Sequence, residues 1–70
     1  MSYAPSALVT AARTKGDRTP ADMARRMGMP YLAVYRWATG RHAPGPSGLA
    51  AIEKAYGLTP ADLMREDTAA

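Results

Sequence analysis

The segment YLAVYRWAT, residues 31–39, contains side chains that can contact a partner through charge, hydroxyl groups and apolar surface. If Val34 and Trp37 face a core at helical spacing, other positions of the same helix point largely outward. The outward set is Tyr31, Leu32, Tyr35 and Arg36. Two tyrosines and a leucine on the surface of a small domain serve no solvation purpose, so we expect this face to bind a macromolecule. Leu32 is the member of the set that we expect to be partly buried.

These side chains have the chemistry needed to read base pairs in the major groove of DNA. Arg36 can donate two hydrogen bonds to guanine O6 and N7, and Leu32 and Ala33 can contact a thymine methyl group. Tyr31 and Tyr35 offer hydroxyl groups to a base edge or a phosphate. The expected base contacts are therefore Tyr31, Leu32, Ala33, Tyr35 and Arg36, with a partly apolar readout. A protein interface on the same face is the alternative.

Groups before and after these side chains are suited to binding backbone phosphates. Phosphates are bound by basic and hydroxyl side chains and by the free amides at the start of a helix. We expect such contacts near Thr19 and Ala21, at the start of the preceding helix, and from Thr39, Arg41 and His42 at the end of the segment. A catalytic role for His42 is not expected, since no recognisable motif places a nucleophile or an acid beside it.

Charge is distributed unevenly along the chain. The net charge is +3, but residues 1–46 carry seven of the nine lysines and arginines against two aspartates. A polyanion would dock on this basic half. Arg18, Arg25 and Arg26 belong to it, and we assign them to long-range steering or to solubility rather than to direct contact.

Length and composition exclude several classes of protein. The 70 residues make one small domain, 1–70, with no room for a large enclosed active site. The chain has no cysteine and one histidine, so we expect no disulfide, no metal site and no cofactor, and no motif indicates an enzyme. Neither a membrane span of roughly 20 apolar residues nor a secretory signal is recognisable, which makes a cytoplasmic protein the expectation.

The tetrapeptide TPAD occurs at residues 19–22 and again at 59–62, and we expect each copy to start a helix. Threonine at an N-cap accepts a hydrogen bond from a free amide, and proline at the next position loses no helical donor. An acid three residues after the threonine completes a capping box. The sequences that follow the two copies differ, so the tetrapeptide is a helix signal and not an internal repeat.

Proline and glycine signals divide the chain into five helices, an all-α fold. The helices are expected from about 5 to Gly16, from the first TPAD to Gly28, over 31–39 between Pro30 and Gly40, from 46 or 47 to Gly57, and from the second TPAD onward. The loop after the third helix contains RHAPGPSG, and the tail from about 66 is expected to be disordered. The expected core consists of Leu8, Val9, Ala12, Met23, Ala24, Met27, Val34, Trp37, Leu49, Ile52, Ala55, Tyr56 and Leu63.

Residues 20–40, PADMARRMGMPYLAVYRWATG, resemble the helix-turn-helix of the Cro and phage-repressor family, also called XRE-like. The matching residues are Ala24 at the helix crossing, Gly28 at the turn, Met29 after it, and Val34 and Trp37 facing inward. The resemblance covers residues 9 to 64. It implies a five-helix, lambda-repressor-like DNA-binding domain whose recognition helix, about 30–39, lies in the major groove. The matching residues build this fold and are given no direct contact with DNA.

Three positions depart from the family's pattern. Pro20 stands where the family commonly has a glutamine that binds phosphate or base, and a proline side chain can do neither. Pro30 replaces the usual serine or threonine cap of the recognition helix, and Arg18 replaces an apolar residue. Neither the helix crossing nor the core depends on these positions, so the implied fold is unaffected.

The resemblance implies a sequence-specific transcriptional regulator, and the short chain fits a Cro-like phage or prophage repressor in a bacterial cytoplasm. The alternatives are the antitoxin of a toxin–antitoxin pair and a protein-interaction or anti-repressor module that uses the same face. A repressor of this type would bind a double-stranded operator as a homodimer that is weak or monomeric when free. The expected dimer contact lies around Leu58, Leu63 and Met64, with closure of the monomer core by these residues as the alternative.

Overall fold

The computed structural model describes residues 2–65, which form five α-helices and one pair of two-residue strands. In chain order the elements are β1 (Ser2–Tyr3), α1 (Pro5–Thr14), α2 (Pro20–Met27), α3 (Tyr31–Thr39), α4 (Pro46–Tyr56), α5 (Pro60–Leu63) and β2 (Met64–Arg65). The all-α class and the five expected helices are confirmed. The disordered tail expected from about residue 66 lies outside the described residues.

Threonine caps set the starts of α2 and α5. Thr59 Oγ1 accepts a hydrogen bond from Asp62 N at 3.3 Å, and the Asp62 carboxylate accepts one from Thr59 N at 2.9 Å, which completes a capping box. At α2, Thr19 Oγ1 accepts from Asp22 N at 3.2 Å, but the Asp22 carboxylate accepts from Arg18 N. The expectation of a complete capping box is therefore wrong for the first TPAD, because its carboxylate reaches one residue further back along the chain.

The turn between α2 and α3 depends on Gly28, which has φ 67° and ψ 31°. This left-handed conformation is unfavourable for residues that carry a Cβ atom. It allows the amides of Gly28 and Met29 to donate to the same acceptor, Ala24 O, at 2.8 and 3.2 Å. The chain therefore leaves α2 in one tight turn and enters α3 at a fixed angle.

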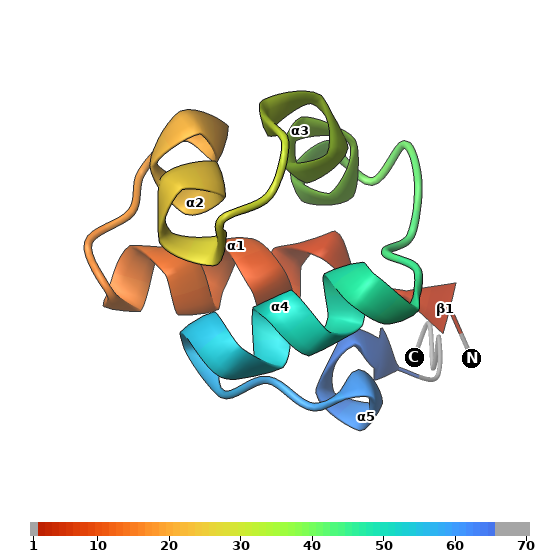
Figure 1. Ribbon diagram of the computed structural model, residues 1–70. Helices are drawn as coiled ribbons and strands as arrows, with labels where there is room; N and C mark the ends of the chain where they lie inside the picture. Colours follow the sequence, from red (N-terminus) through yellow and green to blue (C-terminus); the bar gives the residue numbers. More distant parts are fainter. Residues whose placement is uncertain (1, 66–70) are drawn as a thin grey trace.

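The core lies between two layers of helices. Figure 1 shows α2 and α3 together above α1 and α4, with α5 on the far side of the molecule from α2 and α3. The buried side chains that form the core cluster are Leu8, Ala12, Met23, Ala24, Val34, Trp37, Ile52, Tyr56 and Leu63. Four further residues expected in the core are only partly buried, namely Val9, Met27, Leu49 and Ala55. So small a domain leaves solvent at the edges of each apolar stripe, which explains the difference.

Leu63 belongs to the core of the single chain. Its side chain is 0% exposed, and Leu58 packs against the same core while partly exposed. A dimer contact through Leu63 is therefore wrong, because a side chain buried within its own chain has no surface to offer a second copy. Leu63 instead closes the core of the monomer, the alternative that the sequence left open.

Gly48 determines how closely α4 approaches α3. A Cβ atom at this position would lie 2.6 Å from Trp37 Cη2 and 2.9 Å from the Cβ atom of Pro44. Trp37 is 7% exposed, as its predicted inward position requires. The absence of a side chain at Gly48 therefore makes room for the indole ring between α3 and α4.

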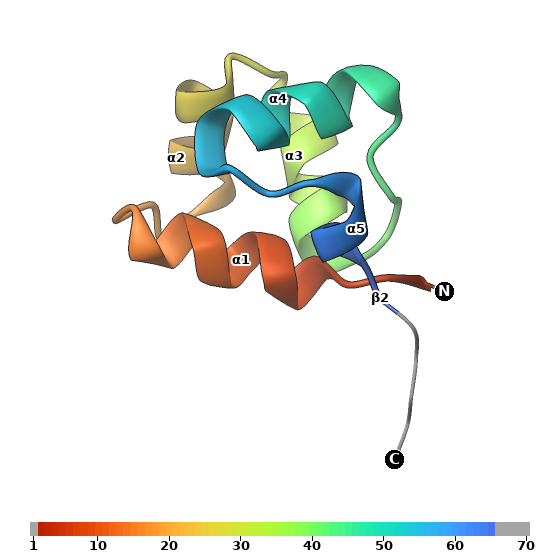
Figure 2. The same cartoon turned by 90° about the horizontal axis from the view of Figure 1, so that it is seen from below.

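The two strands bring the ends of the described chain together. Ser2 pairs with Arg65 and Tyr3 with Met64 in antiparallel register, and Figure 2 shows β1 beside β2 at one edge of the molecule. Sequence analysis predicted no strand here, because a two-residue strand has no alternating pattern to detect.

Candidate nucleic-acid interface

Two buried side chains fix the orientation of α3. Val34 is 0% exposed and Trp37 7% exposed, so the opposite side of the helix faces solvent. Pro30 precedes the helix in an extended conformation, φ −59° and ψ 139°, and forms no side-chain cap. The first amides of α3 have no helical carbonyl to bind, and Pro30 supplies no substitute.

The outward face of α3 exposes apolar surface. Tyr31 is 52% exposed and Leu32 53% exposed, so the expected partial burial of Leu32 is wrong. Leu32 is exposed because it precedes Val34 and Trp37 on a different side of the helix, where no other element packs. The Tyr31 and Tyr35 rings stack one turn apart, with centroids 6.1 Å apart and an angle of 26° between their planes. The stacking orients both rings, and it leaves Tyr35 half-buried.

Arg36 extends from the same helix without an acidic partner. Arg25 and Arg26 of α2 form ion pairs with Asp22 and Asp17. Among residues 2–65 the structure has no comparable ion pair for Arg36 or Arg41, and both side chains are exposed. A guanidinium group that no carboxylate neutralises keeps its donors and its charge available for an anionic partner.

Asp17 connects α2 to the rest of the domain. Its carboxylate accepts a hydrogen bond from Arg26 and one from Tyr56 Oη, the latter at 2.8 Å. The hydrogen bond from Arg26 lowers the pKa of Asp17 below its ordinary value, and burial raises the pKa of Tyr56. Arg26 also donates to Lys15 O at 3.2 Å. Arg26 therefore has a structural role, where the sequence suggested only steering or solubility.

The expected phosphate-binding residues lie at two places. Ala21 is the second residue of α2, where an amide has no helical acceptor, while Thr19 Oγ1 accepts from Asp22 N. Thr39 Oγ1 donates to Tyr35 O at 2.8 Å, so binding a phosphate through this hydroxyl proton would exchange that hydrogen bond. These contacts stay predictions.

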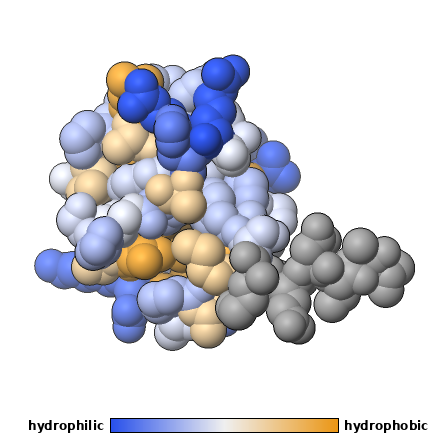
Figure 3. Space-filling model, turned by 90° about the vertical axis from the view of Figure 1, so that its right-hand side faces the viewer, coloured by the Kyte–Doolittle hydropathy of each residue, from blue (hydrophilic) through white to orange (hydrophobic). Residues whose placement is uncertain are grey.

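Arg41 and His42 follow Gly40, the residue that ends α3. Their amides both donate to Arg36 O, at 2.9 and 3.3 Å, and so complete the end of the helix. Any phosphate contact from these two residues would therefore come from their exposed side chains. Figure 3 shows strongly hydrophilic side chains at the upper edge of the molecule, the side on which α3 lies in Figure 1.

The structure thus brings the predicted base contacts onto one helix and places predicted phosphate contacts at the start of α2 and the end of α3. One residue at this site was missed: Tyr3 Oη donates to Trp37 O at 2.6 Å, although the two residues are 34 positions apart. No local sequence signal connects them. A second missed residue is Gly48, to which the sequence analysis gave no packing role.

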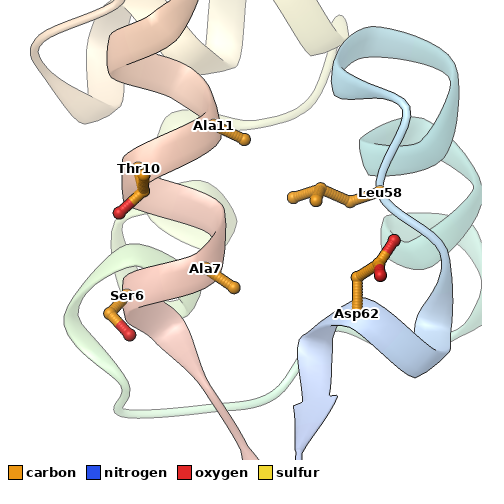
Figure 4. Close-up of a pocket in the computed structure, with 6 residues that line it drawn as sticks. All are labelled: Ser6, Ala7, Thr10, Ala11, Leu58 and Asp62. Carbon is orange, nitrogen blue, oxygen red and sulfur yellow. The ribbon is translucent and has the colours of Figure 1, made fainter.

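A groove of about 490 Å³ lies between α1 and the chain around α5. Figure 4 shows its lining, which comes from α1 and from the chain at the start of α5: Ser6, Ala7, Thr10, Ala11, Leu58 and Asp62. None of these side chains is basic, so the groove is unsuited to binding nucleic acid.

Residues 2–65 contain neither a candidate metal site nor a candidate membrane span. No group of three or more histidine, cysteine, aspartate or glutamate side chains lies close enough to hold a metal ion. No helix in that part of the chain is both long and apolar enough to cross a membrane.

In a comparison with models of protein families, residues 9–63 match the family described as helix-turn-helix. The matched range contains α2, the turn at Gly28 and α3, together with most of α1 and all of α4 and α5. Neither the curated proteins nor the solved structures contain a match to the chain.

Proposed function

The chain belongs to the Cro- and XRE-like helix-turn-helix family of DNA-binding regulators, and from this we propose that it is a Cro-type transcriptional repressor of a phage or prophage. Its place of action would be the bacterial cytoplasm, where the operator DNA lies. α3 would be the recognition helix, and α2 would lie across the groove and contact the backbone.

One observation carries the proposal, namely the outward face of α3. It combines an arginine without an ion-pair partner among residues 2–65, Arg36, with two side chains that are more than half exposed, Tyr31 and Leu32. In the major groove Arg36 would donate to guanine O6 and N7, and Leu32 and Ala33 would contact a thymine methyl group. The tyrosine pair would supply hydroxyl groups to base edges or phosphates.

Backbone contacts would set the register of α3 on the duplex. The amides near Thr19 and Ala21 are at the positive end of the α2 dipole, where phosphate is favoured. At the other end of the site, the side chains of Thr39, Arg41 and His42 would approach phosphates next to the bases that α3 reads. The base contacts of α3 would thus lie between two groups of phosphate contacts, which do not depend on the DNA sequence.

Selection of bound sequences from a random pool of duplex DNA tests this proposal. The repressor proposal predicts enrichment of one motif with two-fold related half-sites. Binding to that motif and to a random duplex should both weaken steeply as salt is raised, because cations are displaced from the phosphates. Failure to enrich any sequence, together with binding that does not respond to salt, would reject the proposal.

A protein-interaction module is the second candidate, and the exposure of Tyr31 and Leu32 is the observation that favours it. Exposed aromatic and apolar side chains also form the centres of protein interfaces. The same selection distinguishes the two candidates, because a protein-binding face has no reason to enrich a duplex sequence.

A further inference from the structure

The N-terminal segment crosses the end of the recognition helix. Tyr3 Oη donates to Trp37 O at 2.6 Å, and the Tyr3 ring packs half-buried against the core. Trp37 O is one of the last four carbonyls of α3, which lack the usual helical partner, and it also accepts from Gly40 N at 3.3 Å. The hydroxyl of a residue before α1 therefore adds a second, shorter hydrogen bond to a carbonyl in the last turn of α3.

Other contacts hold this segment firmly on its opposite side. Tyr3 pairs with Met64, and Ala4 N donates to Leu63 O at 2.7 Å. Leu63 is 0% exposed, so the segment is attached to the centre of the core. Tyr3 is thus anchored independently of α3.

Contact between α1 and the end of α3 reinforces the connection. A Cβ atom at Gly40 would lie 3.1 Å from Pro5 Cγ, so Pro5 packs directly on the residue that ends the helix. Gly40 has φ 80°, a conformation that residues with a Cβ atom rarely adopt. The chain from Tyr3 to Pro5 therefore contacts both the last turn of α3 and the residue after it.

This last turn supports two of the side chains assigned to DNA binding. Arg36 is one residue before Trp37, and Arg36 O accepts from the amides of Arg41 and His42. We propose that Tyr3 is a positioning residue, whose hydroxyl fixes the last turn of α3 and thereby the directions of Arg36 and Arg41 on specific DNA. The inference rests on the proposed DNA-binding role of α3.

The hydroxyl of Tyr3 is suited to this task at neutral pH. Burial raises the pKa of Tyr3 to about 12, so the group stays protonated and remains a hydrogen-bond donor well above physiological pH.

The test replaces Tyr3 and a matched control tyrosine. Tyr3→Phe removes only the hydroxyl that reaches Trp37 O, and Tyr56→Phe removes only the hydroxyl that reaches Asp17, before α2. Each variant loses one hydrogen bond from a partly or largely buried phenol, so each should be less stable to urea than the parent. The hydrogen bond lost in Tyr3→Phe involves α3, and the one lost in Tyr56→Phe does not.

Affinity is measured on the duplex that the parent protein selects from a random pool and on a random duplex of equal length. Tyr3→Phe should bind the selected duplex about three- to tenfold more weakly, in the range expected for loss of one hydrogen bond. Its affinity for random duplex should change less than about twofold, since that binding depends on long-range charge. Tyr56→Phe should keep the parent's ratio of the two affinities.

Amide hydrogen exchange without DNA gives the second readout. The amides of Gly40, Arg41 and His42 should exchange faster in Tyr3→Phe, relative to the rest of the chain, and keep their parent pattern in Tyr56→Phe. An unchanged exchange pattern, or an equal loss on selected and random duplex, would overturn the positioning role. If the parent selects no duplex at all, the proposed function fails instead, and the exchange data still decide whether Tyr3 fixes the turn.

Discussion

The arginines of the domain form two groups. Some are held in ion pairs within the chain, and others keep their charge available for an anionic partner. Arg25 and Arg26 are paired with carboxylates of α2 and of the segment before it, whereas Arg36 and Arg41 have no such pair among residues 2–65. Sequence analysis treated Arg25 and Arg26 as steering charges or solubilising groups, because neither the reach of Asp17 nor its contact with Tyr56 follows from residue spacing. Arg36 was assigned from its helical position alone, and its exposure agrees with that assignment.

Replacing Arg36 and Arg41 separately tests the division into base contact and phosphate contact. Arg36→Ala should weaken binding to the selected duplex by about 1 to 3 kcal/mol and relax base preference at one position. Arg41→Ala should weaken selected and random duplex alike and reduce the salt slope by about one phosphate contact. Lys54→Ala is the charge-matched control, since Lys54 lies on α4 outside the proposed interface. If both arginine variants lost equal affinity for the selected and the random duplex, the division into base contact and phosphate contact would be wrong.

Asp17 predicts a specific response of stability to acid. Its pKa is lowered in the folded protein by the hydrogen bond from Arg26, so its stabilising effect is present above the ordinary aspartate pKa of about 3.9. This stabilisation is lost as the pH falls through the lower folded value. Asp17→Asn should therefore be less resistant to urea than the parent at pH 7, and the difference should shrink towards pH 2. A difference that stayed constant over this range would mean that the carboxylate charge is not responsible.

At the scale of elements, local signals predicted the helices well and their packing less well. The two TPAD segments, the prolines and the left-handed glycine at 28 are local devices, so helix order and limits could be derived from them. The close approach of Gly48 to Trp37 and the pairing of β1 with β2 join residues far apart in the chain. Such contacts leave no periodic pattern, and for that reason the sequence did not indicate them.

Gly48→Ala tests the contact between α4 and α3. The added methyl group would lie 2.6 Å from Trp37 Cη2, so the ring or the helix has to move. We expect a loss of about 1 to 3 kcal/mol in the free energy of unfolding, despite the better helix propensity of alanine. Urea unfolding followed by the fluorescence of Trp37 measures both the loss and the change around the ring.

Gly45→Ala is the control for this substitution. Gly45 has φ −81° as the N-cap of α4, and a Cβ atom there meets nothing within 4 Å. It should therefore cost only about 0.5 to 1 kcal/mol, because alanine is a poorer N-cap than glycine but meets no steric clash here. If both alanine variants were equally stable, close packing at Gly48 would not be what holds α4 in place.

At the scale of the whole molecule, we expect two copies of the protein on one operator, because a single α3 reads too few base pairs. One recognition helix contacts only a few base pairs, too few to select a site among roughly a million or more competing positions. We predict two protein chains per selected duplex, with half-site centres roughly 34 Å apart. Sedimentation of the free protein and of the complex measures the stoichiometry. One chain per duplex at saturation, on a site without symmetry, would exclude the dimer.

Amide chemical-shift mapping tests most directly whether the protein binds DNA through α3. The selected duplex is titrated into isotope-labelled protein, and the shift of each backbone amide is followed by NMR. Binding of DNA through α3 should produce the largest changes over residues 31–36, at the start of α2 and at Arg41 and His42, with small changes along the groove between α1 and α5. Changes concentrated at that groove, with α3 unaffected, would contradict the account.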